Sequence, residues 1–461
     1  YLHHMGKSVR LLLSSSPDVF EHDSRINYQI ITHLGLPVHV FDPTSPTDVR
    51  SLVTDGTIII DALLGTGSSG PLRSPLLELV NTLRPLHVSV VAIDLPTGLN
   101  ADSGKVDTAP LRCDYTITFQ LPKICHFTTP GAGFCGKVVV VDLGIFDDAI
   151  LSAGISTHVM DHETMRRWYV KRDQNVHKGT YGHVLAAGGS KGKSGAIALT
   201  SRASLEMGAG LCTAFIPGSV SCAFHRTTLE NMSIPYGSNN TAYLNETAAE
   251  VCLSYLEDKH VLAIGPGMGN NADTLAFLRG VMTQEKLPVI LDADALNLVA
   301  ENPELWEVVS PEGHQTRCIL TPHPGEMARL MSLTVLDIQE QRLEAARQLS
   351  AERNVVVVLK GAGTVVATPN GTAYISSVGN PGMASAGVGD VLTGVIAGLI
   401  AQGYNLLKAS VMGVYLHAIS AEIVVEMFGH EGVTASKISR YLGAALKKVI
   451  ETDNYQQLVL R

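Results

Sequence analysis

The sequence predicts an α/β protein made of two three-layer α/β/α domains. Short apolar runs of strand composition alternate with helix-like segments twice along the chain, as in parallel sheets with helices on both faces. Loops rich in glycine or acid follow many of these runs, as at the carboxyl ends of parallel strands. A more polar stretch, about residues 147–178, has no strong strand signal and separates the two series. We therefore expect domains of residues 1–157 and 158–461.

Composition narrows the class of protein. Hydrophobic residues make up 45% of the 461 residues and charged residues only 17%, which indicates a packed globular protein. The net charge of −9 and the lack of a basic run argue against a nucleic-acid partner. Seven scattered cysteines form no Cys-x-x-Cys pair, which favours a reduced, cytoplasmic setting. We find no signal peptide and no uninterrupted apolar span of transmembrane length, so no membrane partner is expected.

The first series contains six expected strands and at least two helices. The helices are expected at residues 24–34 and 75–83. The strands are expected at residues 9–13, 38–41, 57–60, 88–93, 115–119 and 137–141. The chain opens with Tyr1 rather than Met, and its first five residues read as the end of a helix. We therefore expect sequence to be missing upstream.

The second series repeats the pattern and ends in helices. Strands are expected at residues 183–187, 211–215, 261–264, 288–291, 318–320 and 355–359. A hairpin of residues 364–368 and 373–376 is predicted from the turn signal Asn370-Gly371. Helices are expected at residues 195–207, 390–402, about 404–427, and 436–451.

The most informative segment is Asn380–Asp390, which runs into an apolar helix-like stretch. Gly387 and Gly389 can turn backbone N–H groups towards a ligand, and the helix that follows brings the positive end of its dipole to the same place. This combination suits a phosphate. Asp390 at that position could take a proton from a hydroxyl near a nucleotide phosphate, or could simply cap the helix. The segment alone leaves both interpretations open.

Four further loops follow consecutive expected strands, and we expect them to line one rim of the sheet. They are Gly265–Gly269, Asp292–Asn297, Thr321–Glu326 and Lys360–Thr364. Each alone could be an ordinary turn, but four in succession favour a ligand site. The glycines of the last loop expose N–H groups and its lysine adds positive charge for a phosphate, without the spacing of a Walker A motif.

Three side chains in these loops have alternative roles. Asp292 and Asp294 could hold Mg²⁺ through water, or could cap the helix that starts near Ala295. His323 stands between two prolines, and could donate to a substrate or lie on the surface.

The first series carries its own cluster. The Gly65-x-Gly67-x-x-Gly70 spacing formally matches a dinucleotide fingerprint, but a proline follows it and the next helix begins too late, so an ordinary NAD dehydrogenase is disfavoured. Asp61 and Thr97 end neighbouring strands and offer oxygens for a hard cation, although Asp61 could be a strand-end cap. Asp94 can act as acid or base, and Lys123 can help neutralise a phosphate.

The motifs of the second series resemble the ADP-dependent NAD(P)H-hydrate dehydratases, from about residue 160 to the end of the chain. They are His177-Lys-Gly179, Gly265–Gly269, Asp292–Asn297, Thr321–Glu326, Lys360–Thr364 and Asn380–Asp390, in family order with none missing. The resemblance implies a ribokinase-like fold and Asp390 as the catalytic base. It also implies nucleotide contacts for ADP or AMP at Lys360, Gly361, Ala362, Gly363, Thr364 and Gly389. Contacts to the hydrated dinucleotide are implied at Ala196, Gly267, His323 and Asp390.

The first series is similar to the NAD(P)HX epimerase domain often fused in front of that dehydratase. The resemblance implies a Rossmann-like domain with K⁺ at Asp61 and Thr97, and Asp94 as the proton-transfer residue. The implied substrate contacts are Gly65, Thr66, Gly67, Ser68, Ser69, Gly70, Pro71 and Asp94. The family's Asn-Asn-Gly-Gly-Asp-Gly loop is absent and should lie just before Tyr1. The epimerase site is therefore expected to be incomplete in this chain, and its activity is open to doubt.

Together these features predict a bifunctional nicotinamide-nucleotide repair enzyme. The resemblance implies ADP-dependent dehydration of (6S)-NAD(P)HX to NAD(P)H with release of AMP and phosphate, and interconversion of R and S NAD(P)HX. It implies Mg²⁺ with ADP or ATP, and a homo-oligomer. Two rivals remain: a ribokinase-like small-molecule kinase with a stable phosphorylated product, and a non-catalytic nucleotide-binding protein.

Overall fold

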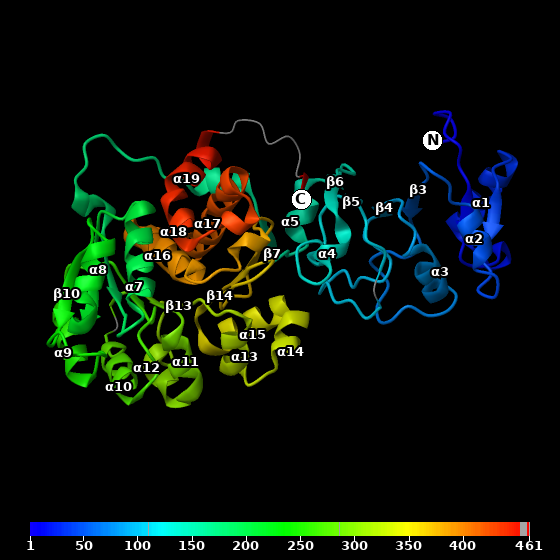
Figure 1. Cartoon of the computed structure of the whole chain (residues 1–461). Coiled ribbons are helices and arrows are strands. Elements are labelled where there is room, and N and C mark those ends of the chain that lie inside the picture. Colours follow the sequence, from blue (N-terminus) through cyan, green and yellow to red (C-terminus); the bar gives the residue numbers. More distant parts are fainter. Residues whose placement is uncertain (109, 285, 452–458, 461) are drawn as a thin grey trace. The chain divides into compact units, whose positions relative to one another are not determined.

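The computed structural model describes residues 1–108, 110–284, 286–451 and 459–460, which form two compact units. The division falls between Phe146 and Asp147 (Figure 1), ahead of the position expected after residue 157. The reason is that α5 (Asp147–Ser152) and β7 (Thr157–Met160) belong to the second unit. β7 lies in the polar stretch that has no strong strand signal in the sequence, and it pairs with β16 (Ala373–Ser376).

Among the described residues, the first unit contains a sheet of five strands, of which the four within residues 58–141 match the sequence prediction closely. The fifth strand, at residues 459–460, was not predicted. The strand order of this sheet is β17-β6-β5-β4-β3, and only β17 runs antiparallel to its neighbour. The strands are β3 (Ile58–Asp61), β4 (Ser89–Ile93), β5 (Tyr115–Phe119), β6 (Lys137–Val141) and β17 (Val459–Leu460). The apolar face of α3 (Leu76–Leu83) contributes Leu79 and Val80 to the core of this unit.

Two strands of the first unit stand apart from this sheet. β1 (Leu11–Leu13) and β2 (Val38–Val40) form a separate parallel pair, where the sequence suggested one continuous sheet. Residues 1–6 form turns rather than the end of a helix. The other helices of the unit are α1 (His22–His33), α2 (Thr47–Ser51) and α4 (Ala132–Cys135).

The second unit is built on one long sheet in the order β10-β9-β8-β11-β12-β13-β14-β15-β16-β7. From β10 to β14 all neighbours are parallel, and β15 is antiparallel to both of its neighbours. The strands are β8 (His183–Ala187), β9 (Leu211–Pro217), β10 (Met232–Tyr236), β11 (Val261–Ile264), β12 (Val289–Leu291), β13 (Cys318–Leu320), β14 (Val356–Leu359) and β15 (Val365–Ala367). β10, at one edge, was not predicted.

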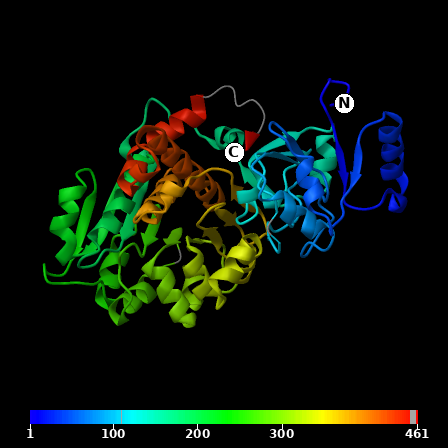
Figure 2. The ribbon, with the colours of Figure 1, turned by 45° about the vertical axis from the view of Figure 1, so that its right-hand side comes forward.

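Helices cover both faces of this sheet, which completes the predicted three-layer fold (Figures 1 and 2). Every residue of β8, β11, β12, β13 and β14 is buried, as expected for strands covered on both faces. One face carries α7 (Ser194–Glu206), α16 (Val388–Ala401), α17 (Leu406–Phe428), α18 (Ala435–Arg440) and α19 (Leu442–Glu451). The remaining helices of the unit are α6 (His162–Trp168), α8 (Ser221–Thr227), α9 (Glu246–Ser254), α10 (Ala272–Val281), α11 (Asp294–Glu301), α12 (Trp306–Val309), α13 (Pro324–Met331), α14 (Val335–Glu340) and α15 (Arg342–Arg353).

Helix α17 bears on the expectation that no uninterrupted apolar span has transmembrane length. It has 23 residues and a mean hydropathy of 1.5, enough by length and composition to cross a membrane. Residues 409–421 are nevertheless all buried, against α16 and α19 among other elements. Its apolar character is therefore explained by its place in the core of the second unit.

Candidate functional site

The four predicted loops lie at one edge of the second sheet. β11, β12, β13 and β14 are consecutive neighbours and run parallel, so the loops that follow them meet at the same rim. Gly265 opens the first loop with a φ of 116°, and a Cβ there would stand 1.9 Å from the carbonyl oxygen of Asp292. Only glycine allows these two loops to approach so closely.

Asp390 lies in the first turn of α16, which points its N-terminus at this rim. Gly387 precedes the helix with a φ of 82°, the left-handed conformation that the sequence predicted for a glycine turn. Gly389 has an ordinary helical backbone, and its role is spatial: a Cβ there would stand 3.2 Å from Lys360 Nζ. Since Gly387 and not Asp390 is the N-cap residue, the carboxyl of Asp390 remains for another task.

The surroundings of Asp390 hold its pKa near neutrality. Burial raises the pKa to about 7, with a further rise from the charge of Asp292 that Lys360 partly opposes. A carboxyl with such a pKa can accept a proton and release it again at neutral pH, as a general base must.

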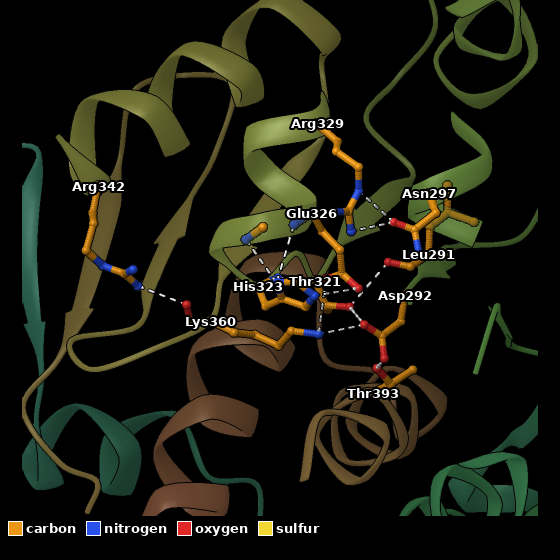
Figure 3. A network of polar contacts seen from close by, with 11 residues as sticks. Leu291, Asp292, Asn297, Thr321, His323, Glu326, Arg329, Arg342, Lys360 and Thr393 are labelled. Carbon is orange, nitrogen blue, oxygen red and sulfur yellow. Dashed lines mark hydrogen bonds and ion pairs between the residues drawn. The ribbon is translucent and has the colours of Figure 1, made fainter. Parts of the chain in front are cut away.

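Lys360 stands at the centre of a buried polar network (Figure 3). Its Nζ donates to Asp292 Oδ1 at 2.8 Å and lies 3.7 Å from Glu326 Oε2. Burial alone would lower the pKa of Lys360, but the two carboxylates outweigh it and the pKa is raised. Lys360 is therefore a fixed positive charge at the rim, beside the first turn of α16.

His323 caps α13 and keeps half of its ring exposed. Its Nδ1 accepts the N–H groups of Gly325 and Glu326, while Glu326 Oε2 accepts the N–H of His323 at 2.7 Å. Burial and the charge of Lys360 lower the pKa of His323, so the ring is neutral near pH 7. Burial also raises the pKa of Glu326 to about 7. The cap explains why His323 is held in place, and its Nε2 lies 3.4 Å from Glu326 Oε1.

Ala196, Gly267 and Asp390, three of the predicted substrate contacts, belong to elements that touch one another. A Cβ on Gly267 would stand 3.1 Å from the Cβ of Ala196. Ala196 is on α7, which packs along α16, and Thr200 Oγ1 of α7 donates to the carbonyl oxygen of Asp390 at 2.9 Å.

Asp294 does not cap its helix, which corrects one of the alternatives raised above. The N-cap position of α11 is occupied by Ala293, and Asp294 Oδ2 instead accepts the N–H of Gly269 at 2.8 Å and lies 3.2 Å from Lys193 Nζ. Both oxygens of Asp292 accept hydrogen bonds from protein donors. Among the described residues there is also no group of three His, Cys, Asp or Glu side chains that could hold a metal. The geometry gives no direct support for Mg²⁺ held by these aspartates.

The predicted nucleotide loop, Lys360–Thr364, rests on a buried arginine that sequence reasoning missed. Arg342 is 2% exposed and donates to the carbonyl oxygens of Leu359 and Lys360 at 3.0 and 3.1 Å. Gly361 and Gly363 have φ values of 137° and 65°. Arg342 lies on α15 outside any motif, so no local signal pointed to it.

In the first unit, Asp61 and Thr97 meet at the ends of β3 and β4. Asp61 Oδ1 accepts the Thr97 hydroxyl at 2.6 Å and Oδ2 accepts the Thr97 N–H at 2.8 Å, and both side chains are buried. Oxygen donors of this kind suit a hard cation. Here Asp61 and Thr97 also hydrogen-bond to each other, so a cation would have to share their oxygens with these bonds.

Asp94 is held as a carboxylate by Lys123. Its φ of 70° places it in a strained turn, and its Oδ1 accepts from Thr118 Oγ1 at 2.8 Å and from Lys123 Nζ. Burial would raise the pKa of Asp94, but the bonds from Lys123 and Thr118 lower it. Lys123 was expected to neutralise a phosphate, whereas the structure pairs it with the predicted proton-transfer residue.

The predicted substrate loop of the first unit borders a cavity of about 230 Å³. Ser68, Ser69, Gly70 and Pro71 line it together with Gly98–Asn100, while Asp94 is not among the lining residues. Helix α3 begins at Leu76, well after Gly70, as the sequence analysis expected when it set aside an ordinary dinucleotide fingerprint.

Comparison with known proteins covers both units. A family model described as NAD(P)H-hydrate dehydratase matches residues 184–443, and one described as YjeF-related protein N-terminus matches residues 1–125. A bifunctional NAD(P)H-hydrate repair enzyme of Moorella thermoacetica is 35% identical over 98% of this chain and 84% of its own length. The chain belongs to the bifunctional NAD(P)H-hydrate repair enzyme family. The Escherichia coli member is 31% identical over 98% of this chain and 82% of its own length.

A solved structure supports the repair-enzyme fold of the second unit. The ADP/ATP-dependent NAD(P)H-hydrate dehydratase of Bacillus subtilis, co-crystallised with ATP and Mg²⁺, is 29% identical and aligns with a TM-score of 0.55. The alignment covers 63% of this chain and 98% of that one. The family and the two-domain α/β fold expected from the motifs are thereby confirmed.

Proposed function

We propose that the second unit dehydrates the S form of hydrated NADH or NADPH at the expense of ADP or ATP. The observation that carries this proposal is Asp390, a half-buried carboxyl with a pKa of about 7 at the N-terminus of α16, next to the fixed charge of Lys360. A phosphate at a helix N-terminus, a lysine and a poised carboxylate are the parts that transfer of a phosphoryl group to a hydroxyl requires.

The chemistry follows from these positions. Asp390 takes the proton of the C6 hydroxyl while the hydroxyl oxygen bonds to the terminal phosphorus of the nucleotide. AMP leaves when ADP is the donor. The C6–O bond then breaks, phosphate departs with the electron pair, C5 gives its proton to solvent and the C5–C6 double bond returns. Water is a poor leaving group at neutral pH and phosphate a good one, so the nucleotide makes the elimination feasible. The N–H groups at Gly387–Gly389 and the ammonium of Lys360 stabilise the phosphoryl charge.

Mg²⁺ enters this proposal with the nucleotide, where it would neutralise phosphate charge. Two observations favour entry with the nucleotide. A Bacillus subtilis relative was crystallised with ATP and Mg²⁺, and the described residues of this chain hold no cluster of three metal-binding side chains.

We propose in addition that the first unit interconverts R and S hydrates. The ionised carboxylate of Asp94 moves the proton, and the loop Gly65–Pro71 binds the hydrated dinucleotide beside the cavity that it borders. Asp61 and Thr97 would hold K⁺, which would supply a fixed positive charge at the ends of β3 and β4.

The dehydration is tested with chemically hydrated NADH and ADP. Absorbance of the reduced nicotinamide should return as AMP and phosphate appear in equal amounts. AMP and a stable phosphorylated hydrate without recovered absorbance would instead favour a small-molecule kinase. If ADP stays intact and no absorbance returns, the proposal fails.

The epimerisation is tested separately by chromatography. Pure R hydrate incubated without nucleotide should convert to a mixture of R and S. The rate should depend on K⁺ when it is compared with Na⁺ at the same ionic strength. A rate no greater than that of buffer alone would contradict the assignment of the first unit in this chain.

A further inference from the structure

Asp292 lies where four elements of the second unit converge. It follows β12 directly, is 1% exposed, and accepts three side-chain hydrogen bonds (Figure 3). Its Oδ1 accepts from Lys360 Nζ and from Thr321 Oγ1, both at 2.8 Å, and its Oδ2 accepts from Thr393 Oγ1 at 2.7 Å. One carboxylate therefore ties the ends of β12, β13 and β14 to helix α16.

These bonds reach both charged groups of the proposed reaction. Thr393 is three residues after Asp390, so the two side chains lie on the same face of α16. The bond from Thr393 sets the rotation of the helix, and hence the direction of Asp390. On the other side, Asp292 fixes Lys360 so that its Nζ stands against Gly389.

We propose that Asp292 is a positioning residue of the dehydratase site, which holds the Lys360 ammonium and the first turns of α16 in the arrangement that Asp390 needs. The proposal rests on the proposed dehydration. It gives Asp292 a task other than binding Mg²⁺ or capping a helix, because both of its oxygens are already engaged by protein donors. Removing the charge of Asp292 would break its buried pair with Lys360. Breaking such a pair is strongly destabilising, so the loss of Asp292 should affect the site strongly.

The charge of Asp292 has a second, measurable effect. Four charged groups act on Asp390: Asp292, Asp294 and Glu326 raise its pKa, and Lys360 lowers it, in addition to the effect of burial. Replacing Asp292 with asparagine removes one source of the rise, so the pKa of Asp390 should fall. Asp390 then stays ionised to lower pH, and the acid limb of the pH–rate profile moves to lower pH.

The central test compares Asp292→Asn with the wild-type enzyme, using hydrated NADH and ADP over pH 5–9. The expected result is a fall in kcat of about 100-fold, the cost of misplaced reacting groups, together with the shift of the acid limb to lower pH. A folded variant with wild-type kcat and an unmoved acid limb would overturn the proposal. If the wild-type enzyme itself does not convert the hydrate, it is the proposed function that fails.

Thr393 supplies the matched pair of variants, in case Asp292→Asn does not fold. Thr393→Val removes the hydroxyl but keeps the shape of the side chain, and it leaves the charge of Asp292 in place. We therefore expect kcat to fall about 10-fold while the acid limb of the pH–rate profile stays where it is. Thr393→Ser retains the hydroxyl and should restore kcat. Equal kcat values for the valine and serine variants would contradict the role of this bond. In the double variant Asp292→Asn/Thr393→Val, the losses should be less than additive, because both changes break the same contact.

Discussion

At the scale of single residues, each of the two proposed sites depends on a carboxyl, and the pKa values of these two carboxyls are moved in opposite directions. Burial and neighbouring acids raise the pKa of Asp390 to about 7, whereas Lys123 and Thr118 lower that of Asp94 in spite of its burial. The two aspartates therefore have the same side chain but suit different tasks. Asp390 can bind and release a proton at neutral pH, and Asp94 is held ionised, as a base.

The pH dependence of dehydration follows from Asp390. Only its ionised form can accept the hydroxyl proton, so kcat should be constant well above pH 7 and fall about tenfold per unit well below it. Asp390→Asn should abolish turnover and leave ADP binding, measured by calorimetry, largely unchanged. A flat kcat profile between pH 5 and 8, or an active asparagine variant, would remove Asp390 from its proposed role.

Lys123 should control the pH dependence of epimerisation. Lys123→Gln removes the charge that lowers the pKa of Asp94, so this pKa should rise. Asp94 then loses its proton only at higher pH, and the acid limb of the exchange between R and S hydrates should move to higher pH. Lys137→Gln is the control, because Lys137 is an exposed lysine of the same unit on β6. An identical acid limb in the Lys123 and control variants would argue against the pairing.

At the scale of elements, the N-terminus of α16 depends on one glycine. Alanine at Gly387 would be strained by the φ of 82°, and its Cβ would stand 2.6 Å from Leu199 Cδ1. We expect Gly387→Ala to destabilise the second unit by about 1–2 kcal/mol and to lower kcat, because the helix start must shift. Gly443→Ala on α19 is the matched control: nothing lies within 4 Å of its Cβ, and it should stabilise by up to about 1 kcal/mol. Denaturant unfolding measures both. Equal free energies of unfolding for the Gly387→Ala and Gly443→Ala variants would contradict the expected backbone strain at residue 387.

Helices, strands and loops could be predicted where a local sequence pattern indicated them. β5 and β6 have the predicted bounds because their apolar runs are marked off by turns, and the loops of the rim follow from the parallel order of β11–β14. β7 and β10 were missed, since an edge strand such as Thr157–Met160 or Met232–Tyr236 mixes polar residues or proline into a short run. Contacts between segments that are distant in the sequence could not be predicted from local patterns. The bond from Thr393 to Asp292 and the support of Arg342 under the nucleotide loop appear only in the folded chain.

At the scale of the whole molecule, two compact units each carry one of the proposed reactions. In the first unit, Asp94 accepts bonds from Lys123 and Thr118. In the second unit, the positioning residue Asp292 accepts bonds from Thr321, Lys360 and Thr393. We therefore expect each unit to carry out its reaction with its own side chains. The cytoplasmic setting and the homo-oligomer stay predictions from the sequence.

This separation predicts the yield from a mixture of hydrates. With excess ADP and an equal mixture of R and S hydrates, the wild-type enzyme should recover all of the reduced nucleotide, since epimerisation supplies S hydrate as dehydration removes it. Asp94→Asn should recover the S portion at the wild-type rate and then stop or slow near half of the total. Asp390→Asn should recover none, yet still equilibrate pure R hydrate. If Asp94→Asn lowered the initial rate on pure S hydrate, or Asp390→Asn slowed the exchange, the two sites would be coupled.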